Sequence, residues 1–145
     1  MSEVGTVVLI AALVLTALAA WWLRTRDGAV RTVGTHAEAG PSVFDRLGVR
    51  AADGDLTVVQ FSTAFCSPCR TTKARLQQLQ ATRPGLVVVQ VDAESHLDEV
   101  RELDVRRTPT LFYLNRDGVL IGRSSGAPRP EELTALVDAH VRDGR

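Results

Sequence analysis

A long apolar run opens the chain and distinguishes it from everything that follows. The twenty residues from Val4 to Leu23 carry no charge. At about 1.5 Å per residue, a helix of this length spans the roughly 30 Å hydrocarbon core of a bilayer. Trp21 and Trp22 lie at its far end, where aromatic side chains prefer the headgroup boundary. The pattern predicts a single membrane-spanning anchor over residues 1–23.

The charges beside this run predict its orientation. No basic residue precedes it, whereas arginines follow at positions 24, 26 and 31. Because positive flanks stay on the cytoplasmic side, we expect a single-pass protein of the cell membrane with its domain in the cytoplasm. The alternative is a cleaved secretory signal, since Ala17-Leu18-Ala19 fits a cleavage site. Such a signal would have a positive start and an apolar core of about 7 to 15 residues, and this run has neither.

The rest of the chain alternates between helical and strand patterns. Residues 24–41 are rich in Gly, Ala and Thr, which predicts a tether with room for one edge strand. Residues 42–145 are expected to form one α/β domain. The patterns predict a helix capped by Ser42, a strand over 56–61, a helix over 69–81, a strand over 86–91, a helix opened by a capping box of Ser95 and Asp98, a hairpin of 110–114 with 119–122, and a helix over 130–141. The strand over 86–91 is almost continuously apolar, as expected of a strand covered on both faces.

Composition and charge narrow the classes of function. The 17 Lys and Arg residues balance 17 Asp and Glu residues, so no net charge attracts nucleic acid. A content of 45% hydrophobic and 23% charged residues argues against disorder. Two cysteines are too few for a disulfide scaffold or a four-cysteine metal site within one chain. They must be explained as a local pair.

These cysteines, Cys66 and Cys69, lie where a predicted strand gives way to a helix. At this spacing they can close a small disulfide ring. The first thiol faces unpaired N–H groups and the positive end of the helix dipole, which stabilise a thiolate. We therefore expect Cys66 to attack a partner disulfide and Cys69 to release the partner from the mixed disulfide. Pro68 suits the first helical turn, where its missing N–H breaks no hydrogen bond.

Two other interpretations of the pair are a metal site shared between two copies and a pair of inert core cysteines. His36, His96 and His140 lack the spacing of ligands that would complete a metal site, so no metal is predicted. Inert core cysteines would not need a proline between them at a helix entrance.

The chain resembles the thioredoxin family over about residues 54–143. The matching features are the strand Val58 to Phe61, the turn Phe65-Cys66-Ser67-Pro68-Cys69-Arg70, Val91-Asp92 at the end of the next strand, Thr108-Pro109-Thr110 before the hairpin and Gly126 after it. The resemblance implies a thioredoxin-like fold, with a central mixed sheet and helices on both faces. It also implies that Pro109 is cis and packs against the disulfide, and that the Thr108 backbone binds an extended substrate segment. Phe65, Ser67, Pro68 and Gly126 would line the same substrate groove.

The sequence departs from the family pattern behind the cysteines. Gln60 stands where a buried Asp is common, and Val88 where its Lys partner is common. Phe65 replaces the usual Trp, and Ser67 replaces the usual Gly. Without a carboxylate near Cys69, resolution at neutral pH is expected to be slower, because the attacking species is a thiolate. The other interpretation is that Gln60 is a hydrogen-bonded core amide with no kinetic role.

These observations predict a dithiol–disulfide oxidoreductase with no cofactor beyond the redox-active disulfide Cys66–Cys69. Its expected partners are protein disulfides of dedicated substrates and an upstream reductase, and the chain is expected to be a monomer. One alternative is an extracytoplasmic thioredoxin-like protein for cytochrome maturation or disulfide reduction. Another is a docking module that uses the fold without catalysis.

Overall fold

The computed structural model describes residues 2–26, 30–32 and 42–141. The predicted tether over 24–41 therefore lies mostly outside the described residues. Helix α1 (Ser2–Arg26) carries the apolar run, and its window Gly5–Trp22 is long and apolar enough to cross a membrane, with none of it buried against the rest of the protein. This exposure excludes a role as a core helix.

The domain is built on a five-stranded mixed sheet, with strand order β1-β5-β4-β2-β3. Only β2 and β3 are parallel, and the other neighbouring pairs are antiparallel. The strands are β1 (Val30–Thr32), β2 (Leu56–Ser62), β3 (Leu86–Asp92), β4 (Thr110–Asn115) and β5 (Leu120–Ser125). Strand β1 is an edge strand within the segment predicted as a tether, and it pairs with β5. The predicted thioredoxin-like fold with a central mixed sheet is confirmed.

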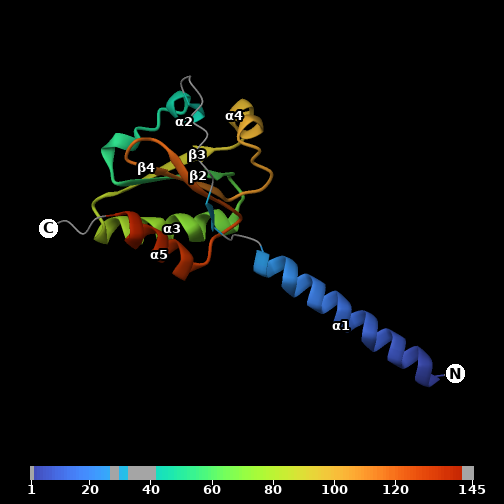
Figure 1. The fold of residues 1–145 in the computed structure, drawn as a ribbon. Coiled ribbons are helices and arrows are strands. Elements are labelled where there is room, and N and C mark those ends of the chain that lie inside the picture. The colour runs from blue at the N-terminus through green and yellow to red at the C-terminus, as the bar shows by residue number, and fades with distance from the viewer. Residues whose placement is uncertain (1, 27–29, 33–41, 142–145) are drawn as a thin grey trace.

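Helices cover both faces of the sheet (Figure 1). One face carries α3 (Ser67–Thr82) and α5 (Pro130–His140), and the other carries α2 (Val43–Arg46) and α4 (Leu97–Glu102), with a short 3-10 helix, Ala51–Asp53, before β2. Successive residues of β2 point into two separate cores, Val58 toward α3 and α5, and Val59 toward Phe44 of α2. Every residue from Leu56 to Phe61 is consequently buried. A strand covered on both faces tolerates no change of register, because a one-residue slip exchanges its two faces.

One expectation from the sequence held only in part, and another was wrong. Strand β3 contributes to both cores, and its Val91 is buried, but it lies at the edge of the sheet, so Val87, Val88 and Val89 are only partly buried and Gln90 is exposed. The predicted capping box at Ser95 is absent: α4 begins at Leu97, and the Ser95 hydroxyl donates instead to the carboxylate of Asp92. Ser42 caps α2 as predicted, and Asp45 completes a capping box that was not predicted there.

The strand pairing gathers three chain segments at one end of the sheet. Phe61, near the end of β2, pairs with Thr110 at the start of β4, and Thr110 pairs with Ser125 at the end of β5. The loops that hold Cys66, Pro109 and Gly126 therefore leave the sheet at the same end, which we call the redox end.

The packing of Phe112 in the core below α2 gives a test of the fold. Its ring is 1% exposed and lies edge-on to the rings of Phe44 and Phe61, with centroids 5.5 and 5.7 Å away. Phe112→Ala should lower the free energy of unfolding by about 3 to 5 kcal/mol. Phe65, which is 97% exposed, is the matched control, and Phe65→Ala should change stability by less than about 0.5 kcal/mol. Urea denaturation measures both, and equal losses in the two variants would contradict the packing described.

Candidate active site

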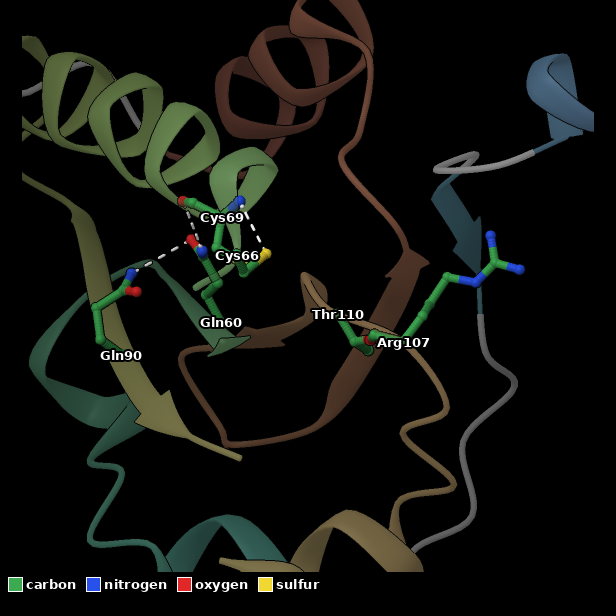
Figure 2. The surroundings of a disulfide bond; sticks show 6 residues. All are labelled: Gln60, Cys66, Cys69, Gln90, Arg107 and Thr110. Carbon is green, nitrogen blue, oxygen red and sulfur yellow. Dashed lines mark hydrogen bonds between the residues drawn. A yellow bond between two sulfur atoms is a disulfide. The ribbon is translucent and has the colours of Figure 1, made fainter. Parts of the chain in front are cut away.

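The two cysteines form a disulfide at the beginning of α3 (Figure 2). Their Cα atoms are 5.2 Å apart. Cys66 is the N-cap of the helix, and its Sγ accepts a hydrogen bond from the N–H of Cys69 at 3.2 Å. Pro68 lies in the first turn, as predicted, where no N–H is needed. The sulfur of Cys66 thus occupies the position where a helix offers unpaired donors to an anion.

The two sulfur-bearing residues differ in their access to solvent. Cys66 is partly exposed, whereas Cys69 is only 3% exposed. Phe65 projects fully into solvent, and Ser67 and Pro68 are also exposed. An incoming molecule therefore meets Cys66 first.

A second loop with a cis proline belongs to the same end of the sheet. The Thr108–Pro109 peptide bond is cis, as the resemblance implied. The Pro109 carbonyl accepts a hydrogen bond from the N–H of Gly126 at 2.7 Å, so Gly126 is joined to this loop. Gly126 has a φ of +93°, a conformation that other residues rarely adopt. The Thr110 hydroxyl donates to the carbonyl of Arg107 at 2.7 Å, and this hydrogen bond links the two ends of the segment that contains the cis peptide bond (Figure 2).

An amide pair supports the disulfide from inside the sheet (Figure 2). Gln60 of β2 is completely buried, and its Nε2 donates to the backbone carbonyl of Cys69 at 3.0 Å. Gln90 of β3 donates in turn to Oε1 of Gln60 at 3.3 Å. Gln60 is thus a hydrogen-bonded core amide, and the residue that it holds is Cys69. Val88, in the position where a Lys is common in the family, is a partly buried apolar residue of the core.

The charged group nearest to this end in the sheet register is Asp92, which pairs with Ser62 at the end of β2. A hydrogen bond from the Ser95 hydroxyl, together with the Glu94 N–H, lowers the pKa of the Asp92 carboxyl. In the interior, burial raises the pKa of Tyr113 to about 12, and its hydroxyl is hydrogen-bonded to Ser124.

Within the described ranges, no group of three or more His, Cys, Asp or Glu residues is arranged to hold a metal ion.

Two contributors to the site carried no signal in the sequence. Gln90 is one, because only the strand register brings it beside Gln60. Arg123 of β5 is the other, since it donates to the carbonyls of Leu103 and Asp104 at 2.9 and 2.6 Å and lies over the ring of Phe112. These contacts fasten the segment that leads into the cis-proline loop.

Comparison with known proteins agrees with this geometry. The family model described as Thioredoxin matches residues 43–139. A thioredoxin of Homo sapiens is 32% identical over 91 residues, which cover 63% of this chain and 85% of the relative. An H-type thioredoxin of Populus jackii is 29% identical over 97 residues, covering 65% of this chain and 69% of the relative.

A solved structure shows the same fold. The oxidised mitochondrial thioredoxin 3 of Saccharomyces cerevisiae superposes with a TM-score of 0.54 at 28% identity, covering 61% of this chain and 82% of that one. The cysteine pair lies within the matched part of the sequence, at the redox end of the matched fold. This chain therefore belongs to the thioredoxin family and is a dithiol–disulfide oxidoreductase.

Proposed function

We propose that the protein is a membrane-tethered oxidoreductase whose domain faces the cytoplasm and reduces disulfides of dedicated partner proteins. The observation that supports catalysis is that the two cysteines differ in accessibility to solvent. Cys66 is accessible and sits at the helix N-cap, whereas Cys69 is buried behind it. This arrangement lets Cys66 capture a substrate while Cys69 stays close enough to displace it from the mixed disulfide.

In the reduced protein, the Cys66 thiolate attacks one sulfur of the substrate disulfide. A bond forms between Cys66 and that sulfur, and the other substrate sulfur leaves as a thiolate that takes up a proton. Cys69 then loses its proton and attacks Sγ of Cys66, which closes the disulfide and releases the second substrate thiol. Two electrons pass to the substrate, and an upstream reductase restores the dithiol.

The substrate groove would lie between the cysteine turn and the cis-proline loop. The backbone of Thr108 has no hydrogen-bond partner among the described residues, so it is free to pair with an extended segment. Phe65, Ser67 and Pro68 supply exposed surface on the cysteine side, while Pro109 and Gly126 fix the opposite loop. Packing of Pro109 against the disulfide is part of this proposal.

Gln60 acts in this proposal as a positioning residue for Cys69. Its amide fixes the Cys69 carbonyl but cannot accept the proton that the thiol must lose. The proton therefore leaves for solvent or for the departing substrate thiolate. Resolution then waits for this proton to leave, because only the thiolate of Cys69 attacks the mixed disulfide. Slow resolution favours partners that stay bound, which supports dedicated substrates.

The cytoplasmic orientation rests on the arginines that follow the apolar helix. The opposite orientation would suit the alternative of an extracytoplasmic protein for cytochrome maturation. A docking module without catalysis is the second alternative, and the accessible sulfur at a helix N-cap argues against it.

The first prediction concerns catalysis by the full chain in detergent micelles. The protein should accelerate reduction of insulin by dithiothreitol. Cys66→Ser should lower this catalysed rate at least about a hundredfold, because no accessible nucleophile remains. Cys69→Ser is the matched variant, and it should accumulate a mixed disulfide that non-reducing electrophoresis detects. No acceleration by the unmodified chain would leave the docking module as the better interpretation, and acceleration at the normal rate by Cys66→Ser would show that Cys66 is not the nucleophile.

The second prediction concerns Gln60. Decay of the mixed disulfide, followed by rapid quench between pH 6 and 8, should accelerate as the pH rises, because Cys69 must lose its proton before it attacks. Gln60→Glu should flatten this profile, since a carboxylate near Cys69 can accept its proton. Gln60→Leu should keep the slope while lowering stability by about 1 to 3 kcal/mol, because the Cys69 carbonyl loses its donor. A flat profile in the unmodified protein would show that the amide does not limit resolution.

The third prediction concerns orientation. Protease added to intact cells, stripped of any outer barrier, should leave a C-terminal reporter fused to the domain intact until the membrane is permeabilised. The full-length mass should also show that α1 is retained. Digestion before permeabilisation would reverse the orientation and favour the extracytoplasmic alternative.

A further inference from the structure

The register of β1 decides which end of the domain lies nearest the apolar helix. Val30, the first residue of β1, pairs with Ser124 of β5. Ser124 pairs with Leu111 of β4, and Leu111 pairs with Gln60 of β2. Gln60 is the residue that holds Cys69. The chain thus enters the sheet in the row of residues directly beneath the disulfide.

The chain between the helix and this row is short. Helix α1 ends at Arg26 and β1 begins at Val30. Four residue steps reach at most about 14 Å, at roughly 3.5 Å per residue in a fully extended chain. Three strand spacings of about 4.8 Å then separate β1 from β2. Whatever path the connection takes, the row beneath the disulfide lies within roughly 30 Å of the end of α1.

The opposite end of the sheet is farther away. Strand β2 runs from the row of Gln60 to its other end at Leu56 in four residue steps, which adds roughly 13 Å at about 3.3 Å per residue. Figure 2 shows β1 and the end of α1 in the same view as the disulfide. The entry point therefore holds the redox end nearer to the membrane and the opposite end farther from it.

We propose that this connection holds the redox end close to the bilayer surface, so that the substrates are disulfides of other membrane-anchored proteins, located within about 30 Å of the lipid headgroups. The inference rests on the proposed function and on insertion of α1 into the bilayer. A partner anchored in the same membrane meets Cys66 repeatedly at a fixed height, which raises its effective concentration. A disulfide held far above the membrane would lie near the opposite end of the domain, out of reach of Cys66.

The test uses the full chain in phosphatidylcholine vesicles with synthetic reporters. Each reporter is a single apolar helix, a helical spacer of EAAAK repeats and a peptide closed by one disulfide. Spacers of about 10, 40 and 80 Å set the height of the disulfide, at about 1.5 Å per helical residue. The Cys69→Ser variant traps the mixed disulfide on Cys66, which is quantified after a fixed time. A second protein carries twenty Gly and Ser residues inserted between Asp27 and Gly28.

We expect trapping to fall at least about tenfold from the shortest to the longest spacer, and the inserted linker to remove most of that difference. Equal trapping at all heights, a height preference unchanged by the linker, or loss of α1 from the vesicles would overturn the inference. Insulin reduction in detergent by the chain that retains Cys69 separates this outcome from failure of the proposed function. If insulin is reduced at the same rate with and without the linker, only the height inference is at stake, whereas no insulin reduction by either would overturn both.

Discussion

The backbone pairing of β2 with β4 is the interaction on which the active site depends. It places Phe61 opposite Thr110, so the strand that leads to Cys66 and the strand that follows Pro109 meet at one end of the sheet. Burial of both faces of β2 fixes that pairing, since a slip would move apolar side chains out of two cores. The position of the cysteines relative to the cis-proline loop is thus a result of core packing on both sides of a single strand.

Local patterns were enough to predict the elements next to the site. The apolar run of β2, the start of α3 at the cysteine pair and the β4–β5 hairpin each have a signature within a few residues. The edge position of β3 and the partners of Gln60 depend on strand order, which no local pattern contains. Ser95 shows a related limit, because a capping box and a bond to Asp92 use the same hydroxyl and the tertiary structure selected the latter.

The interior behind the disulfide is held by neutral groups. Gln60 is fully buried, and both its donor and its acceptor are used, by Cys69 and Gln90. A carboxylate in this position would have to be desolvated, at a cost that a satisfied amide avoids. The arrangement favours a rigid support for Cys69 over assistance in removing its proton. This balance distinguishes the chain from the family pattern that its cysteines otherwise follow.

The separation of α1 from the domain has one more consequence. None of the apolar window of α1 is buried, and all five strands begin after that helix ends. Proteolytic removal of the helix would therefore take away no strand and open neither core. If α1 anchors the chain as proposed, such a cut would release a fragment that keeps the same disulfide, so a locally confined oxidoreductase would become a diffusing one.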